Sequence, residues 1–381
     1  MYSDLINFIK SLYPNQNPVP LHAPVFWGNE KEYIINCVDT TFVSYVGKYV
    51  TQFEEMTAKY TGAKYAVAVV NGTVALNIVL QIAGVKPGDE VITQPLTFVA
   101  TANAISHCGA KPIFVDVDKD TMGMSPEKLT DWLSKNTKYN QSTKQTINQS
   151  TNKVISAIVP MHTFGFPCRI EEIIEVANKY NITVIEDAAE SLGSYCNAMH
   201  TGTFGLAGIL SYNGNKTVTT GGGGMIITDD DEIARKAKHI TTTAKLPHKW
   251  EYIHDEVGYN YRLTNLNAAL GVAQMENIER ILLNKSETAK LYSEFFKNRE
   301  IKFITEQPNT KANYWLNCIQ LKNREEREKL LEETNSNEVT TRPIWRLMNK
   351  LAMYRNCQSG NLENAEWLED RVVNIPSSVR I

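Results

Sequence analysis

The stretch Ser211-Tyr-Asn-Gly-Asn-Lys216-Thr-Val-Thr-Thr-Gly221-Gly-Gly-Gly224-Met225 places one lysine between a short apolar run and four consecutive glycines. The residues around Lys216 are small and mostly neutral, so we expect a confined lysine rather than one on a solvated, charged surface. A confined lysine can lose its proton and act as a nucleophile toward a carbonyl. The glycines would let the backbone come close to a flat, bulky group.

Three interpretations of this stretch compete: a glycine-rich turn with an exposed lysine, a nucleotide-binding P-loop, and a Schiff-base lysine that holds pyridoxal 5′-phosphate (PLP). The P-loop fails on spacing, because Asn215 separates Gly214 from Lys216 and Gly208 lies one residue too far back. The other two interpretations remain open on this stretch alone. The rest of the chain decides between them, according to whether it supplies the other parts that PLP requires.

Length and composition bound the class of protein. With 381 residues, of which 43% are hydrophobic, the chain can form one large domain and a smaller one. A net charge of -3 gives no reason to expect nucleic acid or an anionic membrane as a partner. The 6 cysteines have no paired spacing, which argues against zinc and disulfides, so we expect no metal and a reducing cytoplasm. Residues 1–13 predict an amphipathic helix rather than a signal peptide, and no apolar run approaches the length of a membrane span.

Short apolar strands alternate with amphipathic helices, which is typical of an α/β protein with a mostly parallel central sheet. We expect the strands at residues 65–70, 90–93, 111–116, 153–161, 183–187, 209–213 and 224–228. The expected organisation is an N-terminal helix and arm over 1–28, a large PLP-binding domain over 29–248, and a smaller C-terminal α+β domain over 249–381. A long helix is expected over 265–296.

Residues 136–152 are almost entirely Asn, Gln, Ser, Thr and Lys, with Tyr139 and Ile147 as their only large apolar residues. Such a segment cannot add much to a core, so its composition predicts a mobile surface insertion. A functional lid is the alternative interpretation.

PLP requires an amine, an acid for its pyridine nitrogen, amides and hydroxyls for its phosphate, and a flat apolar surface for its ring. The strand ends supply these parts, in that order, as Lys216, Asp187, Gly72 and Thr73 with Ser211, and Phe98. Ligands of open α/β sheets bind at the carboxyl ends of the strands, where His162 and Asp187 should be near neighbours. Each residue alone has a structural explanation, such as a helix cap, but together they favour PLP.

Six segments carry a resemblance to a known family, namely residues 65–76, 95–116, 159–165, 186–194, 211–225 and 258–271. Over nearly its whole length the chain resembles the DegT/StrS-type nucleotide-sugar aminotransferases, which are PLP enzymes of fold-type I. The resemblance implies that Lys216 forms the Schiff base, that Asp187 pairs with the pyridine nitrogen, and that Phe98 stacks on the ring.

The same resemblance assigns further residues to the site. Those expected to hold the cofactor are Gly72, Thr73, Ser211, Asn213 and Glu190, with Glu190 standing where many members of the family have glutamine. Asn260 would reach the phosphate of the neighbouring subunit, so the active unit is expected to be a homodimer with shared sites. His162 is expected close to the cofactor or the sugar and is counted with the catalytic residues.

Within the family, residues 221–224 and 241–248 are most similar to the LegC-like subgroup of the legionaminic acid pathway. Such an enzyme would take an amino group from glutamate, with pyridoxamine 5′-phosphate as the intermediate cofactor form. It would deliver the amine to a UDP-linked 2-acetamido-4-keto-6-deoxy sugar. No arginine stands near Lys216 in the sequence to hold a second carboxylate, and Arg262 remains available for glutamate or a nucleotide phosphate.

Two alternatives stay open beside the aminotransferase. One is a PLP-dependent sugar dehydratase of the same fold, against which Lys216 argues because such enzymes typically replace this lysine. The other is a PLP-binding regulator without turnover, which would be expected to carry a basic DNA-binding segment; none is apparent.

Overall fold

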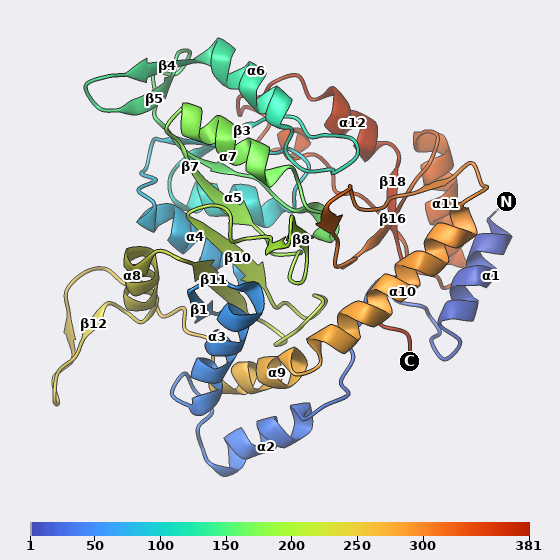
Figure 1. Cartoon of the computed structure of the whole chain (residues 1–381), viewed down its shortest axis with the longest axis horizontal. Coiled ribbons are helices and arrows are strands. Elements are labelled where there is room, and N and C mark those ends of the chain that lie inside the picture. Colours follow the sequence, from blue (N-terminus) through green and yellow to red (C-terminus); the bar gives the residue numbers. More distant parts are fainter. Residues whose placement is uncertain (1) are drawn as a thin grey trace.

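The computed structural model describes residues 2–381 and contains a seven-stranded sheet in the order β1-β11-β10-β7-β6-β2-β3 (Figure 1). Its strands are β1 (Tyr65–Val69), β2 (Glu90–Thr93), β3 (Lys111–Phe114), β6 (Ile155–Val159), β7 (Thr183–Asp187), β10 (Ala207–Ser211) and β11 (Gly224–Thr228). All neighbouring pairs are parallel except those of β11, which runs antiparallel to both β1 and β10. The predicted α/β fold with a mostly parallel central sheet is confirmed.

Helices cover both faces of this sheet, because successive side chains of a strand point to opposite sides. In β10, Ile209 packs in one hydrophobic cluster and Leu210 in another on the opposite face. The helices on the Ile209 face are α4 (Gly72–Ile82), α5 (Val99–His107) and α8 (Asp231–Thr241). Those on the Leu210 face are α3 (Lys48–Thr61), α6 (Pro126–Asn136), α7 (Ile170–Lys179) and α9 (Asn265–Met275).

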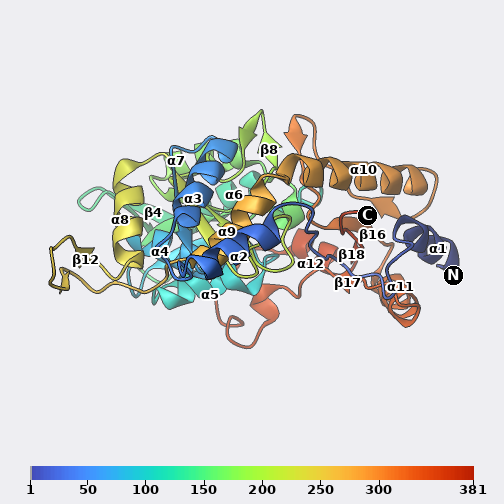
Figure 2. The same cartoon turned by 90° about the horizontal axis from the view of Figure 1, so that it is seen from below.

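A second, smaller sheet of four antiparallel strands has the order β14-β16-β18-β17 (Figure 2). Its strands are β14 (Lys302–Phe303), β16 (Asn317–Gln320), β17 (Arg342–Pro343) and β18 (Val372–Ile375). The helices beside it are α1 (Ser3–Leu12), α10 (Ile278–Phe296), α11 (Arg324–Ser336) and α12 (Glu363–Glu369). Leu5 and Ile9 of α1 share a hydrophobic cluster with Tyr292 of α10, so the N-terminal helix packs on the C-terminal part of the chain.

The long helix expected over 265–296 is two helices, α9 and α10. The chain leaves helical geometry at Asn277 (φ -110°, ψ 5°), whose side-chain amide donates to the carbonyl of Ala273 at 3.1 Å. α9 packs against α3 and against α2 (Glu30–Asp39), so it lies beside the larger sheet. The sequence-based division instead assigns all residues after 248, and therefore α9, to the C-terminal domain. Within residues 2–381, no helix is long and apolar enough to cross a membrane.

The prediction of a mobile insertion at residues 136–152 is wrong. This segment forms an antiparallel hairpin of β4 (Thr137–Asn140) and β5 (Gln145–Asn148). Ile147 and Asn148 are buried, and the Asn148 amide donates to Glu90 at 2.7 Å and to Gln358 at 2.6 Å. Polar composition misleads here because buried acceptors compensate the desolvation of the asparagine amide.

Residues 245–254 contain a second hairpin, β12 (Lys245–Leu246) and β13 (Ile253–His254), which projects from the large-sheet side of the molecule (Figures 1 and 2). Between its strands, Trp250 is 71% exposed and Tyr252 is 80% exposed. Exposed aromatic side chains on a projecting arm mark a surface suited to contact with another protein.

Candidate active site

A cavity of about 630 Å³ lies at the carboxyl ends of β7 and β10. It gathers residues from five separate stretches of the large-sheet region because parallel strands bring their carboxyl ends to one edge. The predicted site residues on its wall are Gly72, Thr73, Phe98, Asp187, Glu190, Ser211, Asn213 and Lys216. The structure thus brings together residues that are up to about 140 positions apart in the sequence, and it leaves His162 and Asn260 off this wall.

Lys216 lies in the loop that follows β10, and its side chain is 13% exposed. Its Nζ atom is 3.1 Å from Oε1 of Glu190 and 3.7 Å from the ring centroid of Trp315. The indole of Trp315 donates to the carbonyl of Asn215 at 2.6 Å and so fixes the loop that carries the lysine. Lys216 is therefore confined, as its sequence setting predicts, between a carboxyl group and an aromatic face.

Asp187 is the last residue of β7 and is 4% exposed. Its Oδ2 accepts a hydrogen bond from the Thr101 hydroxyl at 2.6 Å, and its Oδ1 accepts one from the Ala189 amide at 3.2 Å. Burial raises the pKa of Asp187, and these hydrogen bonds and the charge of Lys216 oppose the rise. A protonated ring nitrogen placed against this carboxyl would add a second positive charge beside it, next to that of Lys216.

Glu190 is held at both carboxyl oxygens. Oε1 faces Lys216, and Oε2 accepts a hydrogen bond from the Phe164 amide at 2.9 Å. Phe164 has φ 56°, a left-handed conformation that a non-glycine residue adopts at a cost, so this contact is built into the fold. Burial raises the pKa of Glu190 to about 7, against the lowering effects of Lys216 and the Phe164 amide, and Asp187 adds to the rise.

The turn between β1 and α4 offers a site for an anion. Asn71 caps α4 by accepting from the Val74 amide at 2.9 Å, which leaves the amides of Gly72 and Thr73 at the helix N-terminus beside the cavity. A Cβ atom on Gly72 would lie 3.2 Å from Cβ of Ser211, so glycine keeps this approach open. Backbone amides, a hydroxyl and a helix dipole at one point are what a phosphate group requires.

The parts of the wall fit PLP. Lys216 would supply the amine, Asp187 the acid, the Gly72–Thr73 turn with Ser211 the phosphate cradle, and half-exposed Phe98 an aromatic face. The fit rests on the chemistry of these groups and on the gap that Gly72 leaves beside Ser211.

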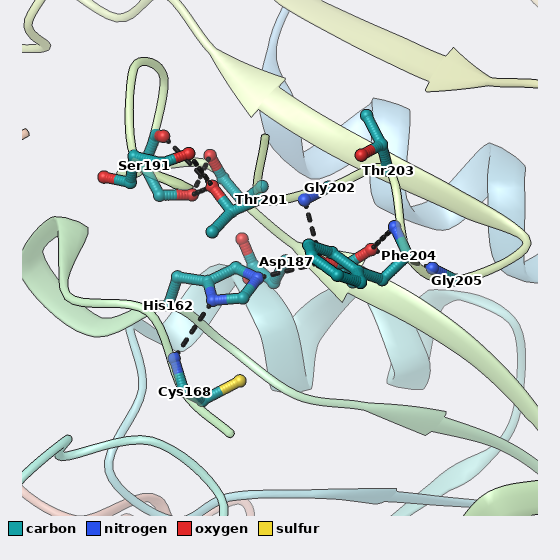
Figure 3. Close-up of polar contacts among 12 residues, drawn as sticks. His162, Cys168, Asp187, Ser191, Thr201, Gly202, Thr203, Phe204 and Gly205 are labelled. Atoms are coloured by element: carbon teal, nitrogen blue, oxygen red, sulfur yellow. Dashed lines mark hydrogen bonds and ion pairs between the residues drawn. The ribbon is translucent and has the colours of Figure 1, made fainter. Parts of the chain in front are cut away.

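His162 is buried and its ring is fully engaged outside the cavity. Its Nε2 lies 3.0 Å from Oε2 of Glu186, and its Nδ1 accepts from the Cys168 amide at 3.2 Å (Figure 3). Burial lowers the pKa of this imidazole, whereas its contacts with Cys168 and Glu186 raise it. Because Nδ1 accepts a hydrogen bond, the ring keeps its single proton on Nε2 and donates it to Glu186. The expected proximity to Asp187 holds for the backbone, since the His162 amide donates to the Asp187 carbonyl at 3.2 Å. The side chain has no access to cofactor or sugar, which corrects its placement among catalytic residues.

Glu186 anchors this buried network. Its carboxylate also accepts from the amides of Gly202, Phe204 and Gly205 at 2.7–2.8 Å (Figure 3). The network therefore ties β7 to the loop before β10, the two strands whose ends carry the site.

Residues 27–381 match the DegT/DnrJ/EryC1/StrS aminotransferase family. The chain belongs to this family.

Similar proteins include the GDP-perosamine synthase of Escherichia coli O157:H7, which is 36% identical over 94% of this chain and 93% of that protein. EpsN of Bacillus subtilis, whose name describes a pyridoxal phosphate-dependent aminotransferase, is 32% identical over 86% of this chain and 81% of its own. Among solved structures, the aminotransferase from Psychrobacter cryohalolentis is 25% identical with a TM-score of 0.82, covering 93% of each chain. Helicobacter pylori PseC has a TM-score of 0.83 at 22% identity, covering 95% of this chain and 94% of that one.

These findings confirm the fold-type I architecture and PLP as the cofactor, and they make the protein a PLP-dependent sugar aminotransferase. A specific place in the LegC-like subgroup is not confirmed, because three similar proteins at 33–36% identity carry the name GDP-perosamine synthase.

As an aminotransferase of this family, the chain builds the second wall of its cavity from the small-sheet region. Sequence reasoning missed these residues, which are Trp315, Leu316, Arg342, Pro343, Ile344, Trp345, Arg346 and Asn374, together with Leu21 of the N-terminal arm. All of them except Leu21 follow Lys216 in the sequence by more than 90 positions, and Leu21 precedes it by an even longer stretch. No local motif therefore joins them to the lysine. The segment Arg342-Pro-Ile-Trp-Arg346, with two cations around a tryptophan, was the available signal.

Two arginines on this wall correct the expectation that none stands near Lys216. Arg342 donates from Nη1 to Asn335 at 3.3 Å and to the Thr341 carbonyl at 3.2 Å. Arg346 is exposed and makes no hydrogen bond, ion pair or ring contact with the described residues. The cavity of this aminotransferase therefore offers positive charge to a substrate anion.

Proposed function

We propose that this aminotransferase moves an amino group from glutamate to the 4-keto group of a nucleotide-linked 2-acetamido-4-keto-6-deoxy sugar, in the synthesis of a bacterial surface-glycan sugar such as legionaminic acid. The observation that carries the proposal is one cavity with a PLP-binding wall around Lys216 and Asp187 and an opposite wall with Arg342, Trp345 and Arg346.

We assign separate roles to the residues of the PLP-binding wall. Bound PLP supplies an electron sink for the reacting carbon. Lys216 holds and releases a proton at Nζ beside that carbon, as a general base and then a general acid. Asp187, buried and fixed by Thr101, holds a proton on the ring nitrogen by its charge. Trp315 and Phe164 close the site against water on the side of Glu190.

The opposite wall supports a nucleotide sugar as substrate. Arg342 and Arg346 can bind the two phosphates of a nucleoside diphosphate, and Trp345, half-buried between them, gives a flat apolar surface for a sugar or base. A cavity of about 630 Å³ also leaves room beyond an amino acid and the cofactor.

Two nucleotides, UDP and GDP, are candidates for the group that is linked to the substrate sugar. Residues 221–224 and 241–248 favour the UDP-linked acetamido sugar of the LegC-like subgroup. The names of relatives at 33–36% identity favour a GDP-linked sugar, which we carry as the second candidate.

We propose a homodimer with shared sites as the working form. Asn260 does not reach the cavity of its own chain; it accepts from Arg262, whose guanidinium lies 3.4 Å from the ring centroid of exposed Tyr45. Exposed apolar side chains are concentrated in residues 42–46 and 250–257, as Phe42, Val43, Tyr45, Val46, Trp250, Tyr252, Ile253 and Val257. A second copy packed on this surface would bury it and bring Asn260 toward the partner's cavity.

The experiment incubates purified protein and glutamate with a panel of UDP- and GDP-linked 4-ketosugars, with mass spectrometry to detect the mass change from ketone to amine. We expect amination of at least one ketosugar, and none by Lys216→Ala. Amination of GDP-linked sugars alone would select the second candidate, and no amination of any ketosugar would refute the function.

A further inference from the structure

The acid–base chemistry of the cavity involves a second ionisable side chain beside Lys216, that of Glu190. Lys216 Nζ lies 3.1 Å from Oε1 of Glu190, which is within the range for direct proton transfer. Within residues 2–381, no other carboxylate makes an ion pair with Lys216. Glu190 is thus the carboxyl group in position to take a proton from this amine.

We propose that Glu190 exchanges a proton with Lys216, so that the pair holds the proton that the lysine must release and recover during amino transfer. When Lys216 carries a free ammonium group, one N–H bond breaks and one O–H bond forms on Oε1, which leaves a neutral amine and a neutral carboxyl. The reverse transfer restores the ion pair. No oxidant, reductant or third reactant takes part.

The surroundings favour this exchange over a permanent ion pair. Glu190 has 2% and Lys216 13% of its side chain exposed, so water screens the pair little. In a dry site the neutral form of a pair competes with the charged form because neither partner keeps its hydration. The second oxygen of Glu190 stays on the Phe164 amide in either state, so the transfer needs no movement of the carboxyl group.

Three ionisable groups lie near Glu190, and two of them shift its pKa. Lys216 favours the carboxylate, whereas Asp187, at the end of β7, disfavours it. The third is the thiol of Cys318 on β16, whose pKa is raised by burial and by the charge of Glu190. With burial as the largest effect, the pKa of Glu190 is raised to about 7. Glu190 therefore keeps its proton below pH 7 and becomes able to accept one from Lys216 above it.

Glu190→Gln tests the proposal, because it preserves the shape and the acceptor for Phe164 but cannot exchange a proton. The first readout is independent of turnover: pH-difference infrared spectra of the cofactor-free protein. We expect a protonated-carboxyl band that disappears with a midpoint near pH 7 in the natural protein and in the control Glu175→Gln, an exposed residue of α7, and that is missing in Glu190→Gln.

The second readout is the rate of the half-reaction with glutamate as a function of pH. It should rise through pH 7 in the natural protein and in Glu175→Gln. In Glu190→Gln it should be roughly 10-fold or more slower at pH 8 and lose this rise. If Glu190→Gln does not fold, Glu190→Asp should keep the infrared band and lose rate, since the shorter carboxyl group no longer reaches Nζ.

The turnover readout rests on the proposed function, whereas the infrared readout does not. Absence of sugar amination with a titrating carboxyl would therefore count against the proposed function alone. A carboxyl group that stays ionised from pH 5 to 9, or a Glu190→Gln rate within about twofold of the natural rate and with the same pH profile, would overturn the proposal.

Discussion

Nε2 of His162 lies 3.0 Å from Oε2 of Glu186, and neither side chain is exposed to solvent. The pair fastens the carboxyl end of β6 to β7 directly beneath the site, since Glu186 precedes Asp187 in the chain. In this position a histidine stabilises the geometry of the site without touching a substrate.

We expect His162→Gln to destabilise the protein by about 1–3 kcal/mol, because it disturbs the donor to the buried Glu186 carboxylate and the acceptor of the Cys168 amide. Since Nδ1 accepts a hydrogen bond, the imidazole is neutral and this loss should not depend on pH. Urea unfolding near pH 7 and near pH 9.5 should therefore show equal losses. His107→Gln, on the surface at the end of α5, is the control. A smaller loss at the higher pH would mean that the buried imidazole is protonated near pH 7.

Asp187→Asn should lower the turnover by at least ~100-fold, the scale of a lost electrostatic contact in an active site. The amide nearly preserves the shape of the carboxyl group. Its oxygen can accept from the Ala189 amide and its NH2 group can donate to the Thr101 hydroxyl, which rotates, so the melting temperature should change little. Steady-state turnover and thermal unfolding measure the two effects. Turnover close to that of the natural protein would show that another residue faces the ring nitrogen.

Arg346→Gln should raise the KM for the nucleotide sugar about 10-fold, which corresponds to about 1.4 kcal/mol, and leave the KM for glutamate unchanged. The reason is that its guanidinium lies on the cavity wall without a contact to the described residues, and is thus free for a phosphate. Arg355→Gln, an exposed arginine on the same stretch outside the cavity, serves as the matched control. A rise in the KM for glutamate alone would assign this arginine to the donor carboxylate.

Asn148→Ala should destabilise the protein by about 1–3 kcal/mol, because it removes the donor to buried Glu90 and leaves that carboxylate short of a partner. Gln141→Ala at the exposed tip of the same hairpin should stay within about 0.5 kcal/mol. Chemical denaturation measures both. If neither variant changes the free energy of unfolding, the contacts of Asn148 do not stabilise the protein.

The cofactor wall was predictable because its parts follow strands, and strand ends of a parallel sheet must converge. Periodicity located β2 and β7 at their observed bounds, and small residues around Lys216 indicated confinement. The direction of a side chain was not predictable in the same way: His162 follows a strand as Asp187 does, yet its ring turns toward Glu186.

The substrate wall could not be predicted for a different reason. Trp315 and Arg346 reach the cavity through the packing of the small sheet against the large one, which leaves no periodic signal in the sequence. The prediction for residues 136–152 fails because it rests on composition. A strand held by asparagine amides has the same residue content as a flexible linker.

The most direct test of the central claim, that this cavity aminates a sugar, is a competition for the amino form of the cofactor. Protein loaded with pyridoxamine 5′-phosphate is mixed with a nucleotide-linked 4-ketosugar or with common 2-oxo acids, and the return of the aldehyde form is followed by its absorbance. We predict that a ketosugar restores the aldehyde form faster than pyruvate or oxaloacetate does. Faster restoration by either of these acids than by every ketosugar in the panel would contradict the account.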